Sequence, residues 1–292
     1  MRVTATHLVQ WSDKREAQGM LPILVRRLIS VTSRITAITM PGGDSVNVPG
    51  WDGVVDVAQG NPWVPDGLSY WELGTSKDPA SKANSDFEKR LEQISTAQKA
   101  QATFVFVTPR RWPGKSTWQE QARKKNAWAD VLVWDADDLE AWLETSPATS
   151  LWLGMQLDIA GHGIEAVENY WEHWKNQSCP AITAPALFHG REQSKLTLQN
   201  NINQHDPLIT VMADSQSEAV AFVCALLIEE GHFLRAACIT SEQGWQFIDA
   251  NPGIELVVIT NNQLSKRRAP REGMSLIVPM AFGDQAFNLM GI

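Results

Sequence analysis

The stretch that decides the fold of the first half reads GWDGVVDV (Gly50–Val57), then a turn-rich NPWVPDG (Asn61–Gly67), then LSYWELGTSKDPASKANSDFEKR (Leu68–Arg90). The apolar runs on either side of the Pro- and Gly-containing turn predict two neighbouring strands, and the polar segment that follows predicts a helix. Asp52 stands at the start of the first strand, and Glu72 lies inside the second.

Two carboxylates on adjacent strands, with a lysine nearby, are the groups that hold Mg²⁺ and activate a water molecule against a phosphodiester. Lys77 and Lys82 follow Glu72 within ten residues, and Lys82 opens the predicted helix. The position two after Glu72, where such sites usually carry lysine, is Gly74.

Each of these residues also has a purely structural interpretation. Asp52, between Trp and Gly, can be a turn residue. Alternation in YWELG places Glu72 on the opposite face from its two large apolar neighbours, so that it faces either solvent or a site. Lys77 and Lys82 can be ordinary surface lysines.

The remaining elements of the first half follow from apolar periodicity. Ser12 is a plausible N-cap for its first helix, and Pro22 marks either the start of that helix or a kink in it. The expected elements are a helix over Ser12–Ser30, a strand over Ile35–Met40, a helix over Ser81–Ala100, a strand over Ala102–Thr108, a helix over Ser116–Asn126, a strand over Val131–Trp134 and a helix over Ala136–Glu144. This order predicts an α/β layered architecture with a mixed sheet flanked by helices.

The second half repeats the alternation of helices and strands. We expect a helix over His162–Trp174, a linker, a helix opening at Gly190, a strand over Leu208–Ala213, a helix over Ser217–Glu229, and strands over Ala236–Thr240, Ile254–Thr260 and Ser275–Met280. This spacing predicts a second, smaller α/β unit with parallel strands.

Composition supports two regions. At 292 residues the chain is long for a single core. Residues 1–155 hold 17 basic and 18 acidic residues, a net charge of −1, whereas residues 156–292 hold 8 and 15, a net charge of −7. This balance excludes a protein that coats nucleic acid electrostatically, so any nucleic-acid contact would be local.

No apolar run approaches the ~20 residues of a membrane span, and the N-terminus lacks the apolar core of a signal peptide. Cys179, Cys224 and Cys238 have no metal-ligand spacing and are interpreted as free thiols. We therefore expect a cytoplasmic protein without a membrane partner.

The order GWDG, a strand with a carboxylate, a helix, FVFVTPRRW and VLVWDADDLEAWL resembles the Mrr-like branch of the restriction-endonuclease-like (PD-(D/E)xK) fold. The resemblance covers about residues 10–155. It implies an Mg²⁺- or Mn²⁺-dependent endonuclease acting on double-stranded DNA. By position Asp52 and Glu72 would be the metal ligands, and Glu16 the outlying acid that some members use.

Because Gly74 occupies the usual lysine position, the resemblance implies a lysine supplied from elsewhere, often from the following helix. Lys82 is the first candidate and Lys77 the second. The segment TPRRWPGKSTW follows a buried strand, and its cations could grip phosphates. An equally good interpretation is a solvated loop whose Trp112 caps the core. The cations of that segment are Arg110, Arg111 and Lys115.

In the second half, GREQSKLTLQNNI followed by LITVMADSQSEAVAFVCALL resembles the start of a STAND-type NTPase module. The loop after the strand, Asp214–Glu218, has neither the glycines nor the Lys-Ser/Thr pair of a working P-loop. We expect a degenerate P-loop-like unit that does not bind ATP. Since such modules are usually larger, we hypothesise a longer protein or a split system completed by a partner.

Together these resemblances imply a nuclease domain over 1–155, a helix and linker over 156–185 and a degenerate STAND-like segment over 186–292. They imply a bacterial anti-phage effector that is switched on by self-association or by a partner defence protein. The alternative is a catalytically inactive sensor or interaction module that keeps the nuclease fold; Gly74 and the acidic balance favour it.

Overall fold

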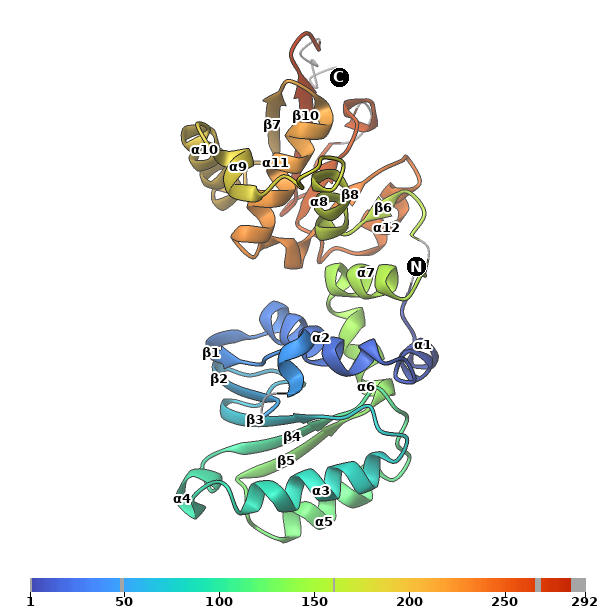
Figure 1. The fold of residues 1–292 in the computed structure, drawn as a ribbon, viewed down its shortest axis with the longest axis vertical. Coiled ribbons are helices and arrows are strands. Elements are labelled where there is room, and N and C mark those ends of the chain that lie inside the picture. Colours follow the sequence, from blue (N-terminus) through green and yellow to red (C-terminus); the bar gives the residue numbers. More distant parts are fainter. Residues whose placement is uncertain (1, 48–49, 160, 266–268, 285–292) are drawn as a thin grey trace. The chain divides into compact units, whose positions relative to one another are not determined.

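The computed structural model describes residues 2–47, 50–159, 161–265 and 269–284 (Figure 1). The chain divides into two compact units, an N-terminal unit over Arg2–Thr149 and a C-terminal unit over Ser150–Ile292. This division and the predicted boundary after residue 155 both fall within helix α7 (Pro147–Gln156).

The N-terminal unit is built on one five-stranded sheet. Its strands lie in the order β1-β2-β3-β4-β5; β1–β2 and β2–β3 pair antiparallel, while β3–β4 and β4–β5 pair parallel. Helices α3 and α5 cover one face, and α1, α2 and α6 lie on the other (Figure 1). The elements are α1 (Ala5–Trp11), α2 (Glu16–Thr32), β1 (Arg34–Thr39), η1 (Gly43–Asn47), β2 (Gly53–Gln59), β3 (Gly67–Leu73), α3 (Pro79–Leu91), α4 (Thr96–Lys99), β4 (Thr103–Val107), α5 (Lys115–Lys124), β5 (Asp130–Trp134) and α6 (Ala136–Glu144).

Helices on both faces explain the composition of the central strands. All five residues of β4, TFVFV, are buried, as expected of a strand covered on both sides. On β3, Trp71 lies near Trp142 of α6, whereas Tyr70 packs with the aromatic core under α3 and α5. Glu72 lies two residues after Tyr70 on the same strand, so its side chain is on the same face of the sheet and faces α3.

Two of the predicted helices differ from those of the structure. Ser12 is the C-cap of α1, a helix that the sequence pattern missed, and the long helix begins at Glu16 with Pro22 inside it. The helix predicted over Ser81–Ala100 starts earlier, because Asp78 caps it and Pro79 occupies its first position. It ends at Leu91, and Ser95 caps the separate short helix α4.

The C-terminal unit is a second helix-covered sheet. Its strand order is β6-β8-β9-β10-β7, with β6 antiparallel and the other pairs parallel. The elements after α7 are β6 (Ile164–Glu165), α8 (Val167–Lys175), α9 (Ala184–Phe188), α10 (Glu192–Asn203), β7 (Leu208–Ala213), α11 (Gln216–Glu229), η2 (His232–Arg235), β8 (Ala236–Ile239), α12 (Gly244–Ala250), β9 (Leu256–Ile259), η3 (Asn262–Ser265) and β10 (Ser275–Ala281). Both units thus confirm the predicted α/β class, and the sheet of the first unit is mixed as predicted. The second sheet, predicted to be parallel, is also mixed, because β6 runs antiparallel to β8.

The start of the helix predicted over His162–Trp174 is wrong, since β6 precedes it and α8 begins at Val167. Gly163 has φ 72°, and a Cβ there would lie 2.1 Å from the Ser241 Oγ. This left-handed, close-packed glycine sends the chain into β6 instead of a helix. Within the described ranges, no helix is both long and apolar enough to cross a bilayer.

Candidate active site

The pairing of β2 with β3 brings the two predicted carboxylates together. Gly53 lies opposite Trp71 in this antiparallel pair, and the same register places Asp52, one residue before β2, across from Glu72. Residues directly opposite in such a pair have Cβ atoms roughly 4.5–5.5 Å apart. The Leu73 N–H donates to the Asp52 Oδ2 at 2.8 Å, which fixes this carboxylate at the end of β3.

Helix α3 presents a stripe of charged side chains to this pair. Lys82, Asp86 and Arg90 recur every four residues, so they lie on one face of the helix. Lys82 Nζ donates to Asp86 Oδ1 at 2.8 Å, and Arg90 Nε donates to Glu72 Oε1 at 2.5 Å. The Glu72 and Arg90 side chains are 3% and 4% exposed, so this ion pair is almost completely removed from water.

Lys82 fills the space above Gly74. A Cβ added to Gly74 would lie 2.9 Å from the Lys82 Cγ and 3.5 Å from its Cε. The side chain of Lys82 thus crosses the position at which a residue-74 side chain would begin. Any larger residue here would displace the lysine stem or press on the neighbouring Phe106 ring, whose Cζ lies 3.3 Å from the same point.

Arg90 ties Glu72 to the segment before β2. Besides Glu72, its guanidinium donates to the Gly50 carbonyl and to the Gln93 side chain. Its Cζ lies 4.5 Å from the centroid of the Trp51 ring, a cation–π arrangement. Arg90 therefore holds the turn that carries Asp52 close to the strand that carries Glu72.

The charges in this cluster do not balance, since among the described residues three carboxylates, of Asp52, Glu72 and Asp86, share the two cations Lys82 and Arg90. Burial raises the pKa of Glu72 to about 7, and the Arg90 hydrogen bond offsets this only in part, while the Asp52 and Asp86 charges add to the rise. Burial likewise raises the pKa of Asp52 above its ordinary value, against the Leu73 hydrogen bond and the Lys82 charge. An additional cation would stabilise both carboxylates.

The oxygen atoms here fit a hard divalent cation. Asp86 Oδ2 is buried without a hydrogen-bond partner. It is therefore an unsatisfied acceptor close to Asp52 and Glu72, the two carboxylates whose pKa values are raised. Among the described residues, no three His, Cys, Asp or Glu side chains are grouped as a ready metal cage. Mg²⁺ commonly takes one or two protein carboxylates and completes its shell with water and phosphate oxygens, so Asp52 and Glu72 suffice as protein ligands.

The other two candidates from the sequence lie apart from these contacts. Lys77 is exposed in the loop after β3, and its charge acts on Asp13, whose pKa is lowered first by the Arg110 hydrogen bond. Glu16 is the first residue of α2, with a half-exposed side chain whose oxygen lies 3.9 Å from Lys14 Nζ. No recorded contact within the described ranges joins Lys77 or Glu16 to Asp52 or Glu72.

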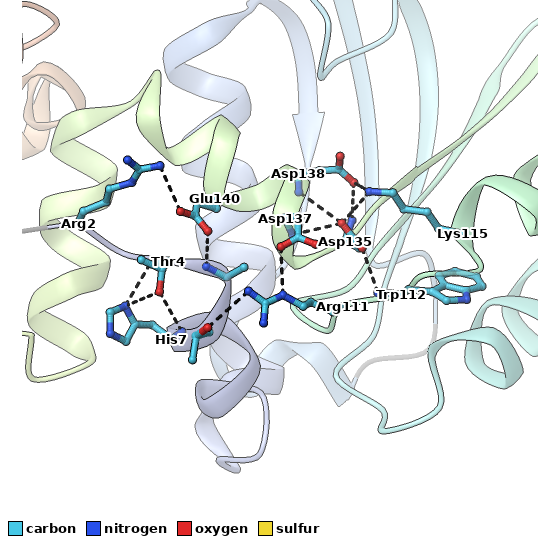
Figure 2. A network of polar contacts seen from close by, with 12 residues as sticks. Arg2, Thr4, His7, Arg111, Trp112, Lys115, Asp135, Asp137, Asp138 and Glu140 are labelled. Atoms are coloured by element: carbon cyan, nitrogen blue, oxygen red, sulfur yellow. Dashed lines mark hydrogen bonds and ion pairs between the residues drawn. The ribbon is translucent and has the colours of Figure 1, made fainter.

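The three cations predicted to grip phosphate all have protein partners. Arg110 donates to the carbonyls of Thr75 and Ser12 and pairs with Asp13 at 2.8 Å. Figure 2 shows Arg111 directed to Asp137 and Lys115 directed to Asp135 and Asp138. The backbone N–H of Trp112 donates to the Asp135 Oδ2 at 3.0 Å. The Trp112 side chain is buried, which matches the interpretation that it caps the core.

In the C-terminal unit, side chains of this chain occupy the carboxyl end of the sheet. Gln216, the first residue of α11, donates to the Asp284 Oδ2 at 2.8 Å, and Asn262 donates to the same oxygen at 3.0 Å. Ser215 caps α11 by accepting from the Glu218 N–H. The segments that follow β7, β9 and β10 are thus joined to one another through the Asp284 carboxylate.

Sequence reasoning missed Asp86 and Arg90. Their signal was the recurrence of charge at positions 82, 86 and 90, one residue ahead of the apolar positions 83 and 87 that face the core. Charged side chains next to the buried apolar stripe of a helix lie at the edge of its contact with the sheet. From there they can reach a carboxylate on a strand. No family model, curated protein or solved structure matches this chain.

Proposed function

We propose that the N-terminal unit is an Mg²⁺- or Mn²⁺-dependent endonuclease acting on double-stranded DNA, of the Mrr-like, restriction-endonuclease-like type. The observation that carries this proposal is the position of Lys82 over Gly74, on the same face of the sheet as Glu72 of β3 and Asp52 before β2. It supports the idea that a helix supplies the lysine that the strand lacks.

Asp52 and Glu72 would hold the metal ion, which would supply a Lewis acid for phosphodiester hydrolysis. Lys82 would orient the attacking water and offset charge on the phosphate. Asp86 is a positioning residue in this scheme, because its 2.8 Å hydrogen bond holds the Lys82 ammonium on the α3 stripe. Arg90 would have to share Glu72 with the metal.

The C-terminal unit, in this proposal, is a degenerate STAND-like segment that serves as a spacer or docking surface and does not bind ATP. The absence of Gly and Lys from the loop after β7, and the Gln216–Asp284–Asn262 contacts there, support it. The whole would be a cytoplasmic bacterial anti-phage effector that is activated by self-association or by a partner.

Cleavage of supercoiled plasmid tests the enzymatic proposal. The wild-type chain, Asp52→Asn, Glu72→Gln and Lys82→Ala are compared with and without Mg²⁺, with Lys77→Ala as the matched control lysine. We expect Mg²⁺-dependent nicking by the wild type and Lys77→Ala alone. Cleavage that survives both carboxylate substitutions would contradict the site assignment.

The alternative function is a non-catalytic interaction module with the same fold. The buried Glu72–Arg90 pair favours it, because a guanidinium already satisfies one oxygen of the second ligand. Absence of plasmid cleavage together with absence of Asp52-dependent metal binding would select this alternative.

A further inference from the structure

Three exposed large apolar side chains of the C-terminal unit lie on β7 or just after β10, the strand that pairs with it. Among the described residues, the large hydrophobic side chains that are exposed are Leu196 of α10, Leu208 and Met212 of β7, and Phe282 just after β10. The last two are 56% and 69% exposed. Singly such residues are unremarkable, but a contiguous group of them marks an interaction surface.

Leu208 and Met212 belong to β7, the last strand of the second sheet, and in the part of the chain that the structure describes no strand pairs with its outer edge. On the paired side, Leu276 N donates to the Pro207 carbonyl at 2.9 Å and Phe282 N donates to the Ala213 carbonyl. Because hydrogen bonding along a strand alternates, the backbone groups of the even-numbered residues, Leu208, Thr210 and Met212, point away from β10. They form an open row of donors and acceptors.

The edge lacks the features that usually protect such strands. The six residues of β7, LITVMA, contain no charge and no proline. Beside them lies a hollow of about 500 Å³ between β7 and α10, lined by Ile209, Thr197 and Phe222 among others. Met212 and Phe282 also line this hollow, so a strand added to β7 would bring some of its side chains against these exposed apolar groups.

The charges around the edge indicate what kind of strand would bind. Asp206 precedes β7 and Asp214 follows it, and neither carboxylate has a recorded side-chain partner in the part of the chain that the structure describes. The C-terminal unit holds 8 basic and 15 acidic residues, a net charge of −7. A second copy would bring one acidic unit against another, whereas a basic segment would be attracted.

We propose that the free edge of β7 receives an extended apolar strand of a partner protein whose two ends carry lysine or arginine. The separation of Asp206 and Asp214 along the strand, about 26 Å at roughly 3.3 Å per residue, sets the spacing of those basic ends. Main-chain hydrogen bonds supply affinity, and the apolar part of the hollow, which includes Ile209 and Phe222, accommodates apolar side chains beside polar lining residues such as Asn201. This proposal is independent of the nuclease proposal.

The test uses the full chain and a synthetic fluorescent peptide of about nine residues, the length that spans Asp206 to Asp214. The peptide alternates Val and Thr between terminal lysines; a second peptide has glutamates at its ends. Anisotropy should show binding of the Lys-ended peptide and about fivefold weaker binding of the Glu-ended one, because two exposed ion pairs contribute about 1 kcal/mol. In the Asp206→Asn/Asp214→Asn variant the difference should vanish.

Thr210→Pro removes an outward N–H while leaving the bonds to β10 intact, and Thr210→Val keeps that N–H. We expect Thr210→Pro to abolish peptide binding at an unchanged melting temperature, and Thr210→Val to retain it. Equal binding of both peptides, binding unaffected by Thr210→Pro, or no binding of either peptide would overturn the proposal. A concentration-dependent dimer that Thr210→Pro dissociates, seen by sedimentation, would overturn it in favour of a second copy.

Discussion

Glu72 should make the stability of the N-terminal unit fall as the pH rises. Its pKa is raised to about 7 in the folded chain from an ordinary 4.5, mainly by burial. Because the folded value is the higher one, the stabilising contribution is complete below the unfolded pKa and is lost as the pH rises through 7. Between pH 5 and pH 8 this single group removes about 2.5 kcal/mol, at about 1.4 kcal/mol per pKa unit.

Urea unfolding of the wild type and Glu72→Gln across this pH range measures the effect. Nine of the 13 tryptophans lie in Arg2–Thr149, so fluorescence mainly follows this unit. The free energy of unfolding of the wild type, minus that of Glu72→Gln, should fall by about 2.5 kcal/mol from pH 5 to pH 8. The matched control, Glu120→Gln, changes an exposed carboxylate of α5 and should give a difference that does not vary with pH.

A wild-type minus Glu72→Gln difference that is also constant with pH would refute this reasoning. It would mean that Arg90 keeps Glu72 charged throughout the range and that the cluster is a closed ion pair. Mg²⁺ added at pH 8 should restore part of the lost stability in the wild type but none in Glu72→Gln, because a ligand that binds only the folded state stabilises it.

Three further predictions follow from the same contacts. Lys82→Ala should reduce plasmid cleavage by about 10²-fold or more while Lys77→Ala leaves it unchanged, because only Lys82 lies over β3. Gly74→Ala should lower cleavage and destabilise the unit by about 1–3 kcal/mol in urea unfolding, since its Cβ would meet the Lys82 stem; unchanged cleavage would separate Lys82 from catalysis. Asp135→Ala should cost about 2–4 kcal/mol, because Asp135 caps α6 and accepts from Trp112 and Lys115, whereas exposed Asp137→Ala should stay within about 0.5 kcal/mol. Equal losses would contradict that assignment.

The periodicity of apolar residues was sufficient to predict the central strands β3 and β4. The alternation in LSYWEL correctly placed Glu72 opposite its apolar neighbours, and the uniform TFVFV correctly predicted a strand inside the sheet. The break of the Ser81–Ala100 helix was missed, because the Ser95 cap competes with an apolar stripe that continues through Ile94. Helix α1 was missed because only three of its seven residues are buried.

The candidate site was predictable only to the level of its two carboxylates and a choice between two lysines. Whether Lys77 or Lys82 lies over Gly74 depends on how helix α3 packs on strand β3. This packing cannot be inferred from the spacing of residues along the chain. The Arg90–Glu72 pair joins residues 18 apart and needs the same information. The sequence could not decide whether the cations after β4 are solvated or bind phosphate. Their acidic partners lie far away along the chain, in the α1–α2 connection and at the start of α6; these cations are Arg110, Arg111 and Lys115.

Calorimetric titration of Mn²⁺ into the full chain at pH 8 tests whether Asp52 and Glu72 hold a divalent cation. Metal binding, unlike cleavage, is measured without a DNA substrate. We predict one binding event in the wild type that weakens as the pH falls below 7, because protonated Glu72 cannot bind the metal. That event should be lost in Asp52→Asn and in Glu72→Gln. No binding by the wild type, or binding of equal strength in both variants, would contradict the claim.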